Sequence, residues 1–201
     1  MKVVAFNGSP RKHGNTYRLL KEVQAGLRAE DIEMEIVHIG GKKVIGCIAC
    51  EKCFEKKDEK CILEKDFING AIEKMKEADG IIISSPTYFA DVTTEVKTLI
   101  DRAGYVGLAN GGMFSRKVGA AIVTARRGGS IHAYDTINHL FGISNMITVG
   151  SSYWNMGFSG NENNVENDEE GLQTMRDLAS NMAWILKKIH AGEPEIPKTA
   201  E

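Results

Sequence analysis

A polar loop near the start of the chain has the residue types needed to bind an anion. Residues 3–6 are apolar and β-favouring, which predicts a buried strand, and Gly8 and Pro10 end it. Asn15 or Thr16 can then cap a helix whose apolar residues recur at helical spacing. A loop between a strand and a helix N-terminus points free backbone N–H groups at its ligand. Four side chains can donate hydrogen bonds to the same ligand in addition to these amides: Ser9, Arg11, Asn15 and Thr16.

The glycine spacing of this loop limits the kind of anion. The dinucleotide fingerprint G-x-G-x-x-G is absent, because Gly8 is followed by Ser9 and Pro10. The P-loop pattern G-x-x-x-x-G-K-[ST] fails as well, since Gly8 and Gly14 lie one residue too far apart and Asn15 replaces the lysine. The loop therefore suits a phosphate monoester better than a pyrophosphate. An ordinary strand-to-helix turn is the alternative interpretation.

Buried strands and amphipathic helices alternate along the rest of the chain. Apolar, β-favouring runs predict five strands, at residues 3–6, 34–39, 80–84, 117–124 and 146–149. Helical spacing predicts further helices, at residues 66–78, 92–103, 133–141 and 168–190. This alternation indicates a doubly wound α/β domain with a parallel sheet, spanning residues 1–190. Residues 44–64 look like a loop insertion after the second strand, and residues 191–201 like a loose tail.

The composition is that of an ordinary globular protein. The chain has 201 residues, of which 42% are hydrophobic and 26% charged, and its formal net charge is −2. So small a net charge gives no general attraction to nucleic acid or to anionic membranes, and we expect neither as a partner. We see no apolar run of membrane-spanning length and no signal peptide, which predicts a cytoplasmic location.

Two further loops are expected at the same sheet edge as the anion loop, because ligands of doubly wound sheets bind beyond the carboxyl ends of the strands. The loop after the third strand offers a turn and an aromatic pair against which a planar ring could lie: Pro86, Thr87, Tyr88 and Phe89. The loop after the fourth strand offers a hydroxyl, a cation and two glycines: Thr124, Arg126, Gly128 and Gly129. Either loop alone is more often a plain connection. Together with the anion loop they indicate a binding site.

Two separated motifs resemble those of the flavodoxin-like NAD(P)H-dependent FMN reductases. One is Gly8-Ser9-Pro10-Arg11-Lys12-x-Gly14-Asn15-Thr16. The other joins Ser85-Pro86-Thr87-Tyr88-Phe89 to Val96-Lys97-x-x-Ile100-Asp101-Arg102. The resemblance implies a flavodoxin-like fold, with a five-stranded sheet in the order 2-1-3-4-5, that binds FMN without a covalent bond. It implies that the FMN phosphate is held by Ser9, Pro10, Arg11, Asn15 and Thr16.

The same resemblance assigns the other parts of the site. The loop after the third strand would line the isoalloxazine ring of FMN, and the loop after the fourth strand would meet its far edge. FMN would carry the chemistry, so no catalytic side chain is expected. No separate fingerprint for NAD(P)H is visible, and NAD(P)H is expected only as a transient donor. The family resemblance also suggests a homo-oligomer, either a dimer or a tetramer.

All four cysteines lie in the predicted insertion with the spacing C-x2-C-x2-C-x7-C: Cys47, Cys50, Cys53 and Cys61. In a cytoplasmic chain, thiols this close indicate metal or redox chemistry rather than disulfides. The first three resemble the run that binds a [4Fe–4S] cluster in bacterial ferredoxins, although Ile62 replaces the proline that follows the fourth cysteine there. Structural zinc sites usually have two separated C-x2-C pairs, which makes zinc the weaker interpretation. Free thiols or a disulfide are further alternatives.

The cysteine motif also resembles that of the iron–sulfur flavoproteins, a branch of the same family. This resemblance implies an electron-transfer protein that passes electrons between a [4Fe–4S] cluster and FMN, with a ferredoxin-like protein or NAD(P)H as donor. Three alternatives stay open at this point. They are an NAD(P)H-dependent FMN or quinone reductase without a cluster, a non-catalytic cysteine redox sensor, and a zinc-stabilised nucleotide-binding protein.

Overall fold

A parallel β-sheet forms the centre of the computed structural model, which describes residues 1–160, 162 and 164–192. Its strands are β1 (Lys2–Asn7), β2 (Glu33–His38), β3 (Gly80–Pro86), β4 (Val118–Ala125), β5 (Ile147–Thr148) and β6 (Met156–Phe158). Each strand pairs in parallel with its neighbours, in the order β2-β1-β3-β4-β5. The predicted doubly wound sheet and its strand order are therefore confirmed.

The fifth position of the sheet is divided between two short strands. β5 pairs with the start of β4, at Val118 and Gly119, whereas β6 pairs with its end, from Val123 to Ala125. The sequence analysis predicted only the first of the two, because β6 has a glycine at its centre, a residue that is depleted in strands. β6 lies beside the carboxyl end of β4, so the residues that follow it reach the edge of the sheet where a ligand is expected.

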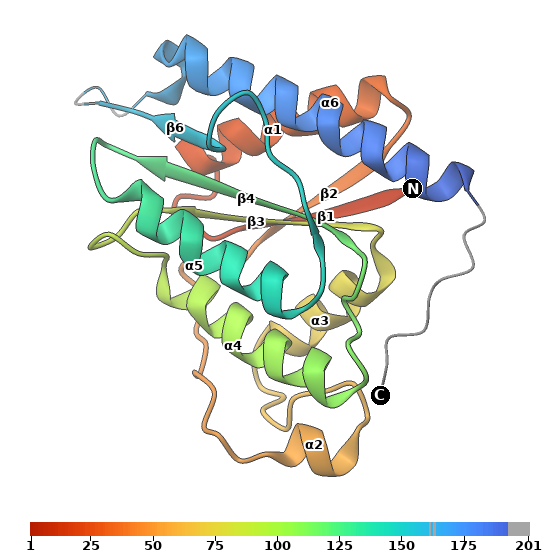
Figure 1. Ribbon diagram of the computed structural model, residues 1–201. Helices are drawn as coiled ribbons and strands as arrows, with labels where there is room; N and C mark the ends of the chain where they lie inside the picture. Colours follow the sequence, from red (N-terminus) through yellow and green to blue (C-terminus); the bar gives the residue numbers. More distant parts are fainter. Residues whose placement is uncertain (161, 163, 193–201) are drawn as a thin grey trace.

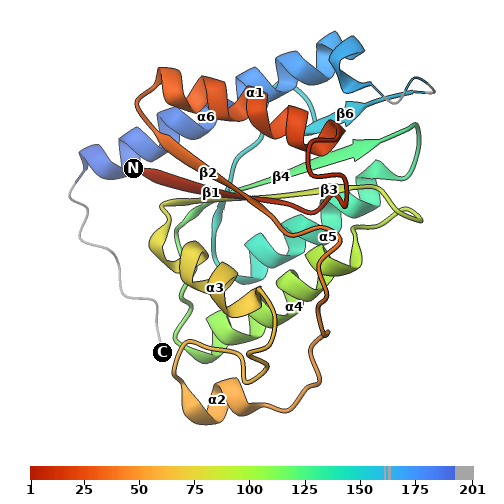
Figure 2. The same ribbon diagram turned by 180° about the vertical axis from the view of Figure 1, so that it is seen from behind.

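Helices cover both faces of the sheet (Figures 1 and 2). One face carries α1 (Asn15–Ala29) and α6 (Glu169–Ala191), and the other carries α3 (Ile68–Glu77), α4 (Thr94–Ala109) and α5 (Ser130–Ile143). Each face has its own buried apolar cluster, formed by the apolar stripes of these helices and one side of the sheet. None of the helices in the described residues is long and apolar enough to cross a membrane.

The last segments of the chain differ slightly from their prediction. The polar stretch before α6 contains a short 3₁₀ helix, η1 (Val165–Asn167). The last helix runs to Ala191, one residue past its predicted end. The predicted loose tail begins at residue 191, which is the last residue of α6. Residues 193–201 of this tail lie outside the described residues.

The insertion between β2 and α3 packs against α4 instead of joining the sheet. It contains one short helix that the sequence analysis missed, α2 (Lys52–Lys56), and turns and coil around it. α2 lies beyond α3 and α4, on the side away from the sheet (Figures 1 and 2). Four non-glycine residues of the insertion have a positive φ: Ala49, Glu51, Lys57 and Glu59. This backbone conformation is unfavourable for L-residues, so the insertion depends on side-chain contacts to keep its shape.

Candidate functional site

The carboxyl ends of β1, β3 and β4 meet at one pocket, as expected for a doubly wound sheet. Nine of the predicted site residues line it: Ser9, Arg11, Asn15, Thr16, Pro86, Thr87, Tyr88, Thr124 and Arg126. The pocket also has two lining residues that the sequence analysis missed, Ala125 and Ser159. Ser159 directly follows β6, so it could have been found only by recognising that short strand. The structure thus brings together the three loops that the sequence analysis singled out.

Four predicted site residues do not line the pocket: Pro10, Phe89, Gly128 and Gly129. Pro10 is exposed, and the Phe89 side chain points fully into solvent. An added Cβ at Gly128 would meet no atom within 4 Å. Gly129 is the N-cap of α5 with a φ of +88°, and an added Cβ there would lie 3.0 Å from Ala90 Cα. A role of these four residues in ligand binding stays a prediction.

The start of α1 faces the pocket with an open first turn. The expected cap by Asn15 or Thr16 is wrong, because α1 begins at Asn15, its N-cap is Gly14, and no side chain caps the turn. Asn15 Oδ1 accepts a hydrogen bond from Val165 N instead (3.3 Å). The backbone N–H groups of Thr16 and Tyr17 lie in the first turn of a helix, where no intrahelical acceptor exists. A capping side chain does not compete for these amides, so an anion in the pocket can accept from them.

Close packing holds the anion loop in place. An added Cβ at Gly8 would lie 2.2 Å from Val96 Cγ2, so the loop passes α4 at a distance that only glycine permits. Ser9 N donates to Asn7 Oδ1 (3.0 Å), and the Thr93 hydroxyl donates to Gly8 O (3.0 Å). Thr93 immediately precedes α4. The loop is therefore tied to that helix as well as to the sheet.

Thr87 carries the observation that points most directly to a ligand. Its backbone N–H donates to Thr124 O (2.8 Å), which fixes the residue at the pocket. Its side-chain Oγ1 is buried and has no hydrogen-bond partner, a state shared in the described residues only by Asn138 Oδ1. A buried hydroxyl left unsatisfied costs about 1–3 kcal/mol. A ligand with a polar edge would satisfy it.

The loop after β3 contains a tight turn. Tyr88 N donates to Asp91 O (2.8 Å), and Asp91 N donates to Tyr88 O (3.0 Å). The two central residues both have a positive φ, +48° at Phe89 and +63° at Ala90, as in a type I′ turn. Such turns favour Asn-Gly, so a phenylalanine at the first central position is strained. The turn leaves the ring of Phe89 exposed, directly after Tyr88, which lines the pocket.

Asp91 ends this turn and is held by several donors. Val92 N and the Thr136 hydroxyl both donate to Asp91 Oδ1, at 2.7 and 2.8 Å. Burial by itself would raise the pKa of Asp91. The two hydrogen bonds and the charges of His132 and Lys97 outweigh burial and hold the pKa below its ordinary value of 3.8. Asp91 is therefore a carboxylate that fastens the turn to α5.

A second cavity, of about 50 Å³, lies between the insertion and α4. All four cysteines line it, with Cys47 and Cys50 exposed and Cys53 and Cys61 half-buried. Burial raises the pKa of the Cys53 thiol, and the nearby Cys61 and Cys47 add to this effect. Opposite the cysteines, α4 contributes three residues to the wall: Arg102, Tyr105 and Val106.

The four cysteines lie around one shared cavity. Within the described residues, no group of three His, Cys, Asp or Glu side chains is placed to hold one metal ion. In a [4Fe–4S] cluster each thiolate binds a different iron atom, so the sulfur atoms surround the cluster instead of converging on one point. Four cysteines around one shared cavity match that requirement. The [4Fe–4S] cluster and the zinc ion both stay predictions of the sequence.

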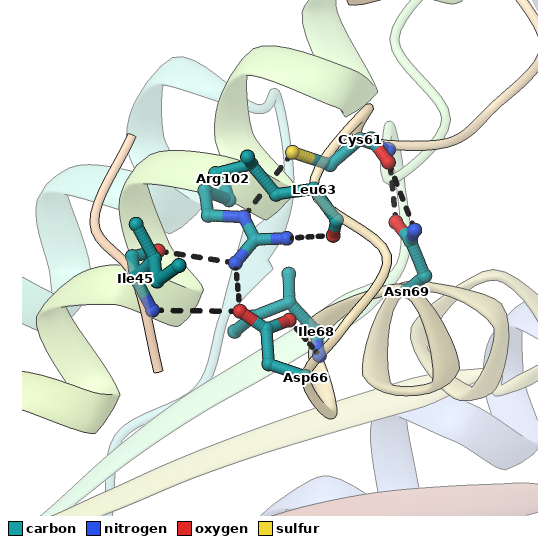
Figure 3. A network of polar contacts seen from close by, with 7 residues as sticks. All are labelled: Ile45, Cys61, Leu63, Asp66, Ile68, Asn69 and Arg102. Carbon is teal, nitrogen blue, oxygen red and sulfur yellow. Dashed lines mark hydrogen bonds and ion pairs between the residues drawn. The ribbon is translucent and has the colours of Figure 1, made fainter. Parts of the chain in front are cut away.

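Arg102 lies buried beneath the insertion, with 1% of its surface exposed, and its guanidinium contacts four residues there (Figure 3). Nε donates to Cys61 Sγ at 3.2 Å. Nη1 donates to Ile45 O at 3.1 Å, and Nη2 donates to Leu63 O at 2.5 Å. Nη1 also forms an ion pair with the buried carboxylate of Asp66. The sequence analysis recorded Arg102 only as part of a motif and missed these contacts.

Asn69 fixes the backbone of Cys61 from the other side (Figure 3). Its Oδ1 accepts from Cys61 N at 2.8 Å, and its Nδ2 donates to Cys61 O at 2.9 Å. Asp66 in turn accepts from Ile68 N at 3.1 Å, which ties the network to the start of α3. The fourth cysteine is thus held by both neighbouring helices, α3 and α4.

Comparison with known proteins adds to this geometry. The model of the family described as NADPH-dependent FMN reductase matches residues 1–161. An iron–sulfur flavoprotein of Methanocaldococcus jannaschii is 36% identical over 196 residues, which cover 94% of this chain and 99% of that protein. An iron–sulfur flavoprotein of Methanosarcina thermophila is 31% identical over 191 residues, which cover 94% of this chain and 97% of that protein.

Solved structures resemble the fold. A WrbA-like flavodoxin from Agrobacterium tumefaciens matches with a TM-score of 0.64 at 18% identity, over 93% of this chain and 96% of that one. A flavodoxin from the domain Archaea matches with a TM-score of 0.59 at 15% identity, over 93% of this chain and 99% of that one. Identities this low bear on the fold alone, and they confirm that it is flavodoxin-like.

Proposed function

The chain belongs to the NADPH-dependent FMN reductase family, and from this premise we propose that it passes electrons between FMN and a [4Fe–4S] cluster. Membership makes it an FMN-binding, flavin-dependent oxidoreductase. The cluster and the electron route are the proposal. One observation carries it, namely that Cys47, Cys50, Cys53 and Cys61 all line one cavity. The names of the two relatives, both called iron–sulfur flavoproteins, agree with it.

The pocket at the sheet edge suits FMN, which has one phosphate monoester and one flat ring. Ser9, Arg11 and the open first turn of α1 would hold the phosphate. Thr87 and Tyr88 would hold the ring, and the unsatisfied Oγ1 of Thr87 is the polar group that the ring edge would satisfy. When bound, FMN supplies one- and two-electron transfer, while the residues of the chain position it.

The cavity under the insertion suits a cluster with four thiolate ligands. The four cysteines would hold it, with the Arg102 guanidinium against Cys61. When bound, a [4Fe–4S] cluster supplies one-electron transfer. We propose a ferredoxin-like protein as the donor on this side and NAD(P)H as a transient donor on the flavin side. We also keep the cytoplasm as its proposed location, with no nucleic acid or membrane as a partner.

The two sites share no lining residue, and only the cysteine cavity takes residues from α4. This separation supports a homo-oligomer in which the cluster of one subunit serves the flavin of another. The insertion exposes large apolar side chains that a neighbouring subunit would cover: Ile45, Ile48, Phe54 and Ile62. Light scattering of the purified protein tests this part, and a monomer at all concentrations would contradict it.

The ultraviolet–visible spectrum of protein purified without oxygen, together with iron and sulfide assays, tests the cofactors. Flavin bands with about four iron and four sulfide per chain are expected. Flavin without iron would leave the second candidate, an NAD(P)H-dependent FMN or quinone reductase, which the family match favours. Absence of flavin would overturn the assignment of the sheet-edge pocket.

Turnover separates an oxidoreductase from a cysteine redox sensor. Continuous consumption of NADPH or of reduced ferredoxin, with a quinone as acceptor, is expected in holoprotein. A protein that changes its cysteine oxidation state once and then stops would support the sensor instead.

A further inference from the structure

We propose that Arg102 is the positioning residue of the cluster site: it fixes the Cys61 corner before the cluster arrives and raises the reduction potential of the bound cluster. The proposal rests on the proposed function for its second half only. The first half concerns contacts within the chain itself. Each half has its own measurement.

The four cysteines are not held equally. Cys47 and Cys50 are exposed, on a segment in which Ala49 and Glu51 have a positive φ. Cys61, in contrast, has its backbone N–H and C=O both bound by Asn69, and its sulfur receives the Arg102 Nε–H. One corner of the cavity is thus fixed by hydrogen bonds, while the other depends on a short irregular segment.

The direction of the N–H···S hydrogen bond is set by the remaining contacts of the guanidinium. Nη1 and Nη2 are bound to Ile45 O, Leu63 O and the Asp66 carboxylate, so the planar group cannot rotate. Asp66 compensates the buried positive charge, which would otherwise be strongly unfavourable. A lysine at this position keeps the charge but has only one nitrogen. It cannot bind Asp66 and Leu63 and at the same time donate a directed hydrogen bond to Cys61.

The expected effect on the potential follows from the N–H···S hydrogen bond between Arg102 and Cys61. Hydrogen bonds to ligand sulfurs and nearby charges set the potentials of iron–sulfur clusters. The Nε–H stabilises the negative charge that builds up at Cys61 Sγ when one electron is taken from a reductant such as dithionite. Arg102 therefore favours the reduced state and raises the potential.

Redox titration of anaerobically reconstituted holoprotein tests the second half, with R102K, K76A and N69S as variants. R102K is expected to move the cluster equilibrium about tenfold toward the oxidised state, which is 59 mV for a one-electron couple. The FMN potential should stay unchanged. K76A is the matched control, because Lys76 also holds the insertion, through an exposed ion pair with Glu59, yet it contacts no cysteine. Its cluster potential should equal that of the wild type.

N69S separates tuning from anchoring. It loosens the backbone of Cys61 and leaves the sulfur contact in place, so iron should be lost faster to a chelator while the potential is kept. A potential in R102K equal to the wild type, or one in N69S lowered as far as in R102K, would overturn the tuning role.

The apoprotein tests the first half and does not require a cluster. Trypsin cuts after the lysines of the insertion, and this cleavage reports its local opening. Cleavage within the insertion is expected to be at least tenfold faster in R102K than in the wild type. In K76A its rate should stay within about twofold of the wild type, because breaking a buried ion pair costs far more free energy than breaking an exposed one. Equal rates in R102K and wild type would overturn the anchoring role. If wild-type protein takes up no iron, the proposed function fails, and the anchoring role is still decided by this measurement.

Discussion

The pocket at the sheet edge and the cavity under the insertion hold their residues by different means. The pocket takes its residues from loops whose two ends are fixed by β1, β3 and β4 and by the helices that follow. The cavity takes three of its four cysteines from a segment with one five-residue helix and several residues of positive φ. A buried arginine on α4, instead of the sheet, connects that segment to the domain.

This difference shows which part of the structure positions the residues of each site. Any sequence that folds into this sheet brings the three pocket loops together, because parallel strands end at one edge. The cysteine cavity exists only if the insertion docks correctly, and its docking rests on a few polar contacts around Arg102 and Asn69. The pocket should therefore tolerate changes in the insertion, whereas the cavity should be sensitive to single contacts.

The sharpest test of this independence is Cys50→Ser. Loss of one thiolate ligand should remove essentially all iron, while the flavin content stays at the wild-type level because the two sites share no residue. Iron and flavin assays on one preparation measure both. Lys56→Ala is the control, since it changes an exposed side chain of the same insertion and should keep the iron. Loss of flavin from Cys50→Ser would mean that the two sites are coupled.

Gly8→Ala tests whether the scaffold fixes the pocket. The new Cβ would lie 2.2 Å from Val96 Cγ2 and 2.7 Å from Ser84 O, so the free energy of unfolding should fall by about 2–3 kcal/mol. Urea unfolding measures it. Gly128→Ala is the matched control, because its Cβ meets nothing within 4 Å, and its free energy of unfolding should stay within about 0.5 kcal/mol of the wild type. Equal effects of the two would refute the tight approach at Gly8.

Thr87→Val should act with opposite signs on stability and binding. Removing the buried, unsatisfied hydroxyl should stabilise the apoprotein by about 1 kcal/mol, and the lost partner should weaken FMN binding about tenfold. Thermal unfolding and flavin fluorescence titration measure the two effects. Thr174→Val serves as control, since the Thr174 hydroxyl already donates to Glu170 O (2.9 Å). It should lower stability and leave FMN affinity unchanged. A destabilised Thr87→Val apoprotein would show that its hydroxyl is satisfied.

The smallest effect is expected from Asp91→Asn. A folded-state pKa below the ordinary value means that ionised Asp91 stabilises the fold above about pH 4, and that this contribution is lost as the pH falls through the lowered pKa. Because the side chain is 41% exposed, the contribution should stay below about 1 kcal/mol. Urea unfolding at pH 7 and at pH 3 should give a wild-type advantage that is larger at pH 7 than at pH 3. An advantage of equal size at the two pH values would point to the hydrogen bonds rather than to the charge.

The same difference explains what could be read from the sequence. The strands and the three pocket loops follow from apolar periodicity and from the rule that loops meet at the carboxyl edge, whereas the strand order was implied by the family resemblance. The cap at Asn15 or Thr16 was wrong because Gly14 takes that position, and propensity alone does not fix a boundary to one residue. Ser159 was missed together with β6. The contacts of Arg102 join residues far apart in the chain, from Ile45 to Leu63 and Asp66, and no local pattern encodes them.

The turn from Tyr88 to Asp91 has a consequence for engineering. Its two central positions would be most stable as Asn-Gly, yet the chain has Phe89 and Ala90, each in a conformation that costs about 1–3 kcal/mol. In a library of variants screened for heat resistance alone, substitutions of Phe89 and Ala90 should therefore be selected early. Because Phe89 directly follows Tyr88, which lines the pocket, the most heat-resistant variants of such a library are the ones in which a loss of redox turnover should be looked for first.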